Sequence, residues 1–208
     1  FAVILTVVGA FAAYYGWRPS MLMVAGLFAL ATLLAALLVR DPPPVGKASE
    51  DQEGLLQGLA SIMAIWPLWL IAPVTLSSYA ILAIVRGLWI GPYMTTVHLL
   101  DAVASGEAAF VMAVTMTVGA FAYGALEKAI GQPKTLVAGG TFLTALAFAA
   151  LAVFGHRSAL VATLLFAFIG FAGFTYALLM AHARMFFPGH LIGRGMTFVN
   201  FLFIAGAA

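Results

Sequence analysis

Apolar residues along this chain form seven long runs, separated by short stretches rich in glycine, proline or charged residues. The runs cover residues 1–15, 21–39, 66–93, 108–126, 135–154 and 159–180, and the last begins near residue 195. A helix needs about 20 apolar residues to cross the roughly 30 Å hydrocarbon core of a bilayer. The pattern predicts an all-α polytopic membrane protein with about seven transmembrane runs. Because the first and last runs are cut short, we expect a fragment of a longer protein.

Helix-breaking residues interrupt this pattern in places. Prolines and glycines interrupt the run 66–93, which predicts a tilted or broken helix, because broken helices are tolerated where they line a cavity. Residues 55–65 are apolar enough for a short interfacial helix ahead of that run. Between the later runs, residues 98–107 are expected to form a loop, and residues 182–194 a polar, basic loop.

Composition agrees with a membrane protein and excludes several function classes. Hydrophobic residues make up 64% of the chain and charged residues only 8%, against about 25% charged in soluble domains. A net charge of +2 without a basic run argues against nucleic acid as a partner. The absence of cysteine excludes disulfides and thiolate metal sites. No cofactor or metal is expected, and no catalytic residues are assigned.

One polar stretch divides the chain. Residues 41–58 contain three prolines and several charged side chains, a composition typical of an exposed linker. We therefore expect residues 1–40 to end one helical bundle, residues 41–64 to link, and residues 65–208 to form a second, incomplete bundle. Alternate loops place six bases on the side of the linker, namely Arg40, Lys47, Lys128, Lys134, Arg184 and Arg194. Only Arg18 and Arg157 lie on the other side, so the positive-inside rule places the linker in the cytoplasm.

Arg86 is the strongest candidate for function because it lies inside an apolar run. Insertion scales put an arginine at mid-bilayer at about +2.5 to +3.5 kcal/mol, so such residues usually face a cavity or a partner. If the helix continues, Thr75, Tyr79, Trp89 and Tyr93 share its face. This face could bind a carboxylate or phosphate through the guanidinium. Alternatively, Arg86 snorkels to the headgroups and the aromatics form an interfacial belt. The sequence leaves both interpretations open.

A second constellation lies between the fourth and fifth runs. Gly124 and Gly131 flank Glu127 and Lys128, and Lys134 follows. Glycines let a tight cytoplasmic turn form, and the charged pair could bridge to neighbouring helix ends. From spacing alone, an ordinary positive-inside turn is the better explanation of the segment.

This segment resembles a turn of the major facilitator superfamily, found between the second and third helices of each half. The family pattern is glycine, three residues, aspartate, arginine, one residue, glycine, then bases. Both glycines and the trailing Lys134 match, whereas Glu127 stands one position early and Lys128 occupies the aspartate position. Other stretches resemble this family in the order expected: Gly16-Trp17-Arg18, residues 41–58, Phe187-Pro188, Gly193-Arg194-Gly195 and Asn200. The resemblance places the chain from late helix five to early helix eleven.

The resemblance implies a twelve-helix secondary transporter that moves a small polar or anionic solute by alternating access. Helix seven would carry Arg86, Tyr79 and Trp89 toward the solute, and helix ten would carry Tyr176. With Tyr93 from the face described above, these are the expected substrate-binding residues. The expected partners are the lipid bilayer, a small-molecule solute and a coupled proton or other ion. The expected location is a bacterial inner membrane.

Two rival functions belong to other classes. A polytopic membrane enzyme would need a buried acid or a His/Asp cluster within the runs, and none is present. A seven-helix receptor or sensor agrees with the count of runs, although a retinal-type pump would need a lysine inside one. The four histidines lie in or near loops, which leaves them no evident proton-relay role.

Overall fold

The computed structural model describes residues 15–39 and 54–206, and this part of the chain is helical with no strand. Five of the described helical segments are long and apolar enough to cross a membrane. The expected all-α polytopic fold is therefore confirmed. Contacts divide the chain into two compact units, Phe1–Glu53 and Gly54–Ala208, which are described separately here. Residues 1–14 of the first run and most of the linker 41–64 lie outside the described residues, and the expected domain bounds stay a prediction.

In the first unit, α2 (Trp17–Leu38) is a single apolar helix. Its 22 residues correspond to about 33 Å, enough for one crossing. The helix starts after Gly16, whose φ of +86° suits glycine, and the Ser20 hydroxyl donates to the Gly16 carbonyl across 2.9 Å. The Arg18 guanidinium lies 5.3 Å from the centre of the Trp17 ring, an aromatic–cation pair suited to a headgroup region.

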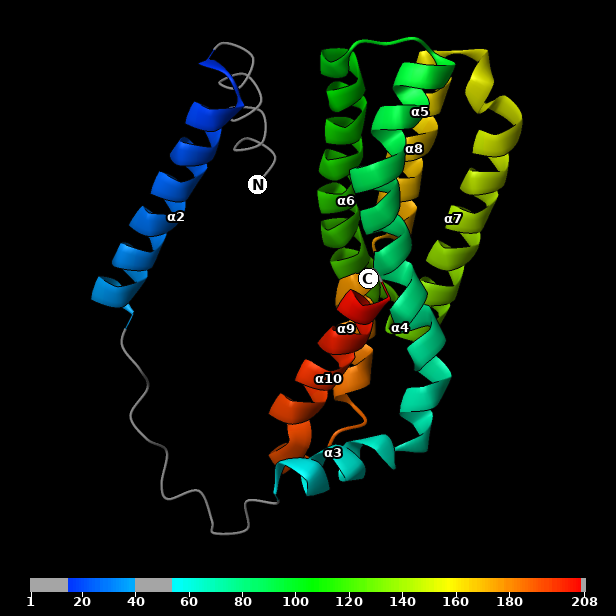
Figure 1. Cartoon of the computed structure of the whole chain (residues 1–208). Helices are drawn as coiled ribbons and strands as arrows, with labels where there is room; N and C mark the ends of the chain where they lie inside the picture. The colour runs from blue at the N-terminus through cyan, green and yellow to red at the C-terminus, as the bar shows by residue number, and fades with distance from the viewer. Residues whose placement is uncertain (1–14, 40–53, 207–208) are drawn as a thin grey trace. The chain divides into compact units, whose positions relative to one another are not determined.

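The second unit is a bundle built from long helices and short irregular turns (Figure 1). Its elements in order are α3 (Leu55–Met63), α4 (Trp66–Ile84), the π-helical turn η1 (Val85–Trp89), α5 (Ile90–Val97), α6 (Ala102–Ile130), α7 (Pro133–Phe154), the 3-10 turn η2 (Gly155–Arg157), α8 (Ala159–Gly173), α9 (Tyr176–Arg184), the 3-10 turn η3 (Gly189–Leu191) and α10 (Ile192–Ala205). The long helices α4–α5, α6, α7 and α8 run side by side, and α3 lies across one end. We call this the basic end, because the α9–α10 connection lies there with Arg184, and Lys134 at the start of α7 lines the same groove as Pro67 at the start of α4.

Two expected loops are shorter than the sequence suggested. The loop predicted at residues 98–107 ends at Asp101, whose carboxylate accepts a hydrogen bond from the Ala104 N–H across 2.8 Å and caps α6. The predicted basic loop 182–194 contains the end of α9 and the start of α10. Helix α6 also continues beyond the predicted 108–126 run, because helices can extend past the apolar core with polar turns.

The run predicted at residues 159–180 is divided into α8 and α9 by a break at Phe174 and Thr175. A break frees backbone carbonyls that must be satisfied inside a bilayer. The Tyr123 hydroxyl of α6 donates to the freed carbonyl of Ala172, and the Thr175 N–H donates to the Gly173 carbonyl across 2.8 Å. These bonds hold the break in place.

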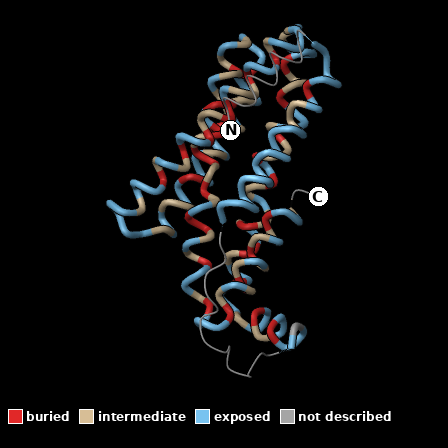
Figure 2. The backbone as a smooth tube through the Cα atoms, turned by 90° about the vertical axis from the view of Figure 1, so that its left-hand side faces the viewer, coloured by how far each residue is buried: buried red, intermediate tan, exposed pale blue. Residues whose placement is uncertain are grey.

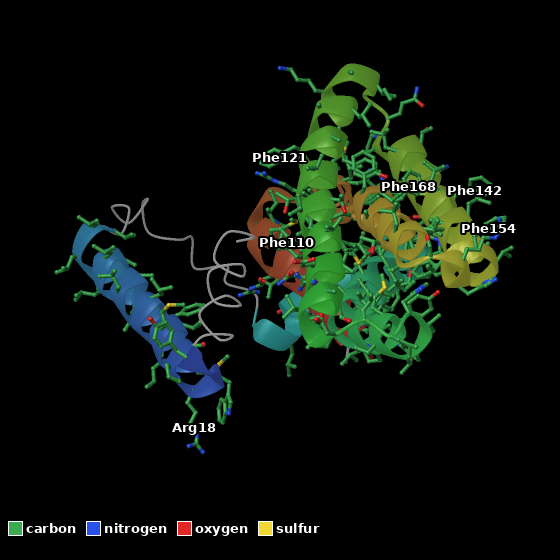
Figure 3. All side chains as sticks on the ribbon, turned by 90° about the horizontal axis from the view of Figure 1, so that it is seen from above. Arg18, Phe110, Phe121, Phe142, Phe154 and Phe168 are labelled. Carbon is green, nitrogen blue, oxygen red and sulfur yellow. The ribbon has the colours of Figure 1, made fainter. Side chains whose placement is uncertain are left out.

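Buried side chains lie on the sides of the helices that face one another (Figure 2). One core cluster joins the end of α4, α5, α6 and α8 around Ile90, Met112 and Ile169. A second cluster joins α3, α4, α9 and α10, from Ile62 near the basic end to Phe203. Exposed phenylalanines lie on the outside of α6, α7 and α8 (Figure 3), where lipid would contact them, as listed here: Phe121, Phe142, Phe154 and Phe168.

Candidate functional site

A cluster of aromatic and amide side chains gathers where α8 breaks into α9. The Tyr176 hydroxyl donates to Oδ1 of Asn200 on α10 across 3.0 Å. The Tyr176 ring centre lies 6.1 Å from that of Tyr79 on α4 and 4.6 Å from that of Phe203 on α10. Phe174, in the break itself, lies 6.5 Å from Tyr176. We call Tyr79, Tyr176, Asn200, Phe203 and Phe174 the tyrosine cluster.

Three helices supply this cluster at about the middle of a span. Tyr79 lies about 20 Å along the Trp66–Val97 span, whose 32 residues extend about 48 Å. Phe203, at 1% exposure, is the most deeply buried member of the cluster. Tyr79, Tyr176 and Asn200 are only partly buried. Part of each of these three side chains is therefore accessible to a ligand.

The chemistry of the cluster is neutral and polar. The Tyr176–Asn200 bond uses the amide oxygen, which leaves both amide N–H donors of Asn200. In the described part of the chain, the structure gives the Tyr79 hydroxyl no hydrogen bond. Tyrosine rings also offer flat apolar faces beside their hydroxyls. The cluster can therefore bind a small solute that combines a flat or apolar surface with hydrogen-bonding groups.

Two of the five expected substrate-binding residues, Tyr79 and Tyr176, belong to this cluster. Sequence reasoning missed Asn200 as their partner and noted it only within a turn motif. The available signal was weak: Asn200 is the polar residue in the apolar stretch Phe198–Phe203, but its partner depends on how α10 packs against α9. Such packing cannot be read from one helix.

Arg86 lies in the π-helical turn η1 and is partly buried. Within residues 15–39 and 54–206, the structure gives its guanidinium no ion pair or hydrogen bond. A Cβ added at Gly87 or Gly91 would meet no atom within 4 Å, so the backbone beside Arg86 is open. Arg86 lies about 30 Å along its span, roughly 6 Å from the span's centre, which is within hydrocarbon depth if the span is centred in the bilayer.

The π turn changes the expected helix face beyond Arg86. A π turn contains one more residue than an α turn, so every later side chain moves to the neighbouring position around the helix. Leu82 is buried at 1% exposure, and the equivalent position two turns later, with the π turn included, is Ile90 at 0%, not Trp89. Trp89 is 63% exposed. The single face expected from Thr75 to Tyr93 is therefore wrong after Arg86.

Tyr93 has a different environment from the tyrosine cluster. Its ring centre lies 5.6 Å from Phe166 on α8 and 5.7 Å from His98, in edge-to-face contacts at the end opposite the basic end. His98 Nε2 lies 2.9 Å from the Gly155 carbonyl and ties the α5–α6 connection to η2. Tyr93 therefore packs between α8 and the α5–α6 connection.

The expected cytoplasmic-loop motif forms the end of α6 and the start of α7, away from the cluster. Gly131 ends α6 with φ +66° and its N–H donates to the Glu127 carbonyl across 2.8 Å. Gly124 lies within α6, Lys128 is exposed in its last turn, and Lys134 lies in the first turn of α7. Elsewhere in the described residues, no group of three or more His, Asp or Glu side chains could hold a metal ion.

Comparison with known proteins agrees with this architecture. The profile that describes the Major Facilitator Superfamily matches residues 1–208. Neither the comparison with curated proteins nor that with solved structures found a match. The membrane-spanning helices and the match over the whole chain lead to one conclusion. The chain belongs to the Major Facilitator Superfamily, a family of membrane transporters.

Proposed function

We propose that this protein is a secondary transporter that moves a small polar or anionic solute by alternating access, and that the tyrosine cluster contacts the solute. One observation carries the proposal. Side chains from α4, α9 and α10 meet near mid-span through the Tyr176–Asn200 hydrogen bond, and their polar groups remain partly exposed. Polar groups at this depth are costly unless they serve a path or a partner.

The break between α8 and α9 supports the same proposal. Non-helical backbone at membrane depth is tolerated where it is buried in protein or lines a cavity. Phe174 of the break contacts Tyr176, so the break and the cluster form one local structure. A broken helix is also a natural place for the two halves of a span to move relative to each other.

Arg86 is a second solute contact in this proposal, one that would select anions. A guanidinium binds carboxylate or phosphate through two parallel hydrogen bonds, and the open backbone at Gly87 and Gly91 leaves room beside it. Trp89 and Tyr93 remain more distant candidates, because Trp89 is displaced by the π turn and Tyr93 is packed against Phe166.

The proposed orientation places the basic end in the cytoplasm of a bacterial cell, with the protein in the inner membrane. Lys134 and Arg184 lie at that end, and Arg157 lies at the other, as the positive-inside rule requires. Transport would be driven by a proton or other ion gradient, or by the gradient of the solute itself. The solute would cross unchanged, without an enzymatic step.

The test measures transport by the full-length protein in proteoliposomes. Labelled monocarboxylates, dicarboxylates, sugars and inorganic phosphate are supplied one at a time, and accumulation is followed with and without a pH gradient. For any solute that is transported, Tyr176→Phe and Asn200→Ala should raise KM about three- to tenfold, because each removes about one hydrogen bond. Thr163→Val is the control, because it removes one hydroxyl from α8 outside the tyrosine cluster, and it should leave KM unchanged. Equal KM values in all four proteins would contradict the assignment of the site.

A further inference from the structure

A hollow lies on the flank of the bundle, and none of its lining residues belongs to the tyrosine cluster. It is a groove between α4, α7 and α9 with a volume of about 670 Å³. Most of its lining is aliphatic or aromatic, including Leu70, Val74, Val137 and Phe142. Leu70 and Phe142 are 67% and 64% exposed, so the groove opens outward from the bundle.

The size of the groove suits one extended hydrocarbon chain. At about 30 Å³ for each water-sized group, this volume holds roughly 20 methylene groups, comparable to a single phospholipid acyl chain. The helices α4 and α7 both belong to candidate membrane spans. An outward-opening apolar groove between two such helices is suited to an acyl chain of the bilayer.

The groove lining also contains basic side chains. Lys134 and His182 are the basic residues of the lining. Nδ1 of His182 is buried and has no hydrogen-bond partner among the described residues, although its ring packs edge-to-face on Phe186 at 5.1 Å. Helix α7 begins at this point, and Gln132 makes no side-chain cap, so first-turn N–H groups stay free. A helix N-terminus favours an anion.

Tryptophans mark this end of the groove as the headgroup level. Trp66 is 70% exposed at the start of α4, and the Trp69 indole N–H donates to the Met63 carbonyl across 2.8 Å. Tryptophan side chains concentrate at the boundary between hydrocarbon and headgroups. Lys134, in the first turn of α7, lines the same groove as Pro67, which follows Trp66, so its long side chain extends into the groove that opens at this level.

We propose that this groove binds an anionic phospholipid, with one acyl chain between α4, α7 and α9 and the phosphate at the start of α7. Lys134 and the free N–H groups of α7 supply the positive charge, and His182 supplies a hydrogen bond to the headgroup or glycerol oxygens. The apolar and basic parts together match an anionic lipid better than a zwitterionic one. The groove shares a core cluster with Tyr79 and Tyr176, but none of its lining residues is a proposed solute contact.

The test uses purified full-length protein and native mass spectrometry with added dioleoyl phosphatidylglycerol or dioleoyl phosphatidylcholine. Phosphatidylglycerol should bind about fivefold or more tightly, as expected for one lysine at an anionic headgroup. Lys134→Gln should reduce this preference to less than about twofold. Lys128→Gln is the matched control, because it removes the same charge from the same turn but outside the groove lining. Equal binding of both lipids by the unmodified protein would overturn the proposal.

Three further variants separate binding of the acyl chain from binding by charge alone. Ala138→Trp fills the groove and should weaken binding of both lipids, whereas Ala149→Trp, exposed on α7 outside the lining, should not. His182→Gln should lower the phosphatidylglycerol preference without abolishing it. If Ala138→Trp leaves lipid binding unchanged, another helix covers the groove in the full protein and the lipid assignment is wrong. Transport of solute can fail or persist in every case, so the two proposals are tested separately.

Discussion

Trp89 and Ile90 are neighbours in the sequence but lie on different sides of their helix: Trp89 is 63% exposed and Ile90 is fully buried. The π turn Val85–Trp89 ends between them. Its additional residue carries Ile90 into the core cluster with Met112 and turns Trp89 outward. The same turn holds Arg86, and π-helical turns occur frequently at functional sites. The helix face that α4 and α5 bury therefore changes at the turn that holds Arg86.

The side of the helix on which Trp89 and Ile90 lie can be measured with spin labels, because the chain contains no cysteine. Trp89→Cys should give a mobile nitroxide that oxygen in the lipid reaches readily. Ile90→Cys should give an immobile nitroxide shielded from oxygen, since Ile90 is at 0% exposure. Leu88→Cys, at 67% exposure, is the matched exposed control. If Trp89 is shielded and Ile90 is mobile, the segment is a continuous α-helix and the π turn is wrong.

Helical spacing predicted the lower part of this face but not the part beyond Arg86. Thr75 and Leu82 are each buried at 1% exposure, as one α-helical face requires, and Tyr79 lies with Tyr176. No residue type specifies a π turn, and Gly87 is not required for one, because a Cβ added there would meet no atom within 4 Å. The register after Arg86 depends on how α5 packs against α6, which a single helix does not reveal.

Tyr123→Phe tests whether the break between α8 and α9 is held by a hydrogen bond. The Tyr123 hydroxyl satisfies the freed Ala172 carbonyl, so its loss should destabilise the folded protein by about 1–3 kcal/mol. Thermal unfolding in detergent should show a lower Tm. Tyr79→Phe is the control, because it also removes one phenolic hydroxyl but no hydrogen bond within the described residues. Equal Tm values for both variants would contradict the role of Tyr123.

Gly119→Ala tests the close packing of α6 against α8. A Cβ at Gly119 would lie 2.5 Å from the Phe171 carbonyl oxygen, closer than such atoms approach, so the helices must separate. The expected cost is about 1–3 kcal/mol. Gly124→Ala, on the same helix with nothing within 4 Å, should be neutral or slightly stabilising. Denaturant titration of both variants in mixed micelles measures the difference, and similar stabilities would argue against the tight contact.

Apolar runs predicted the helices well because lipid imposes a simple length rule. The same rule says little about where helices end outside lipid or break inside it. Asp101 caps α6 within a stretch expected to be a loop, and the break after Gly173 is stabilised by Tyr123 from another helix. For the candidate site, Tyr79 and Tyr176 were expected, whereas Asn200 joined them only through the packing of α10 against α9. Local pattern thus predicts elements, and tertiary contacts decide their breaks and partners.

Arg86→Ala and Arg86→Lys decide whether the solute is an anion. If Arg86 binds a carboxylate or phosphate, Arg86→Ala in the full-length protein should lower kcat/KM for that solute about tenfold or more. Arg86→Lys should also fail to restore transport, because an ammonium lacks the two parallel donors of a guanidinium.

The control is Arg157→Ala, since Arg157 lies in η2 with its guanidinium 4.7 Å from the centre of the Phe154 ring. It removes the same charge from a turn outside the tyrosine cluster and should leave the kinetics unchanged. Insertion of every variant is checked by the yield of folded protein after reconstitution. Unchanged transport in Arg86→Ala, together with raised KM in Tyr176→Phe, would assign a neutral polar solute to the tyrosine cluster. Arg86 would then be a residue that reaches the headgroups from inside its span.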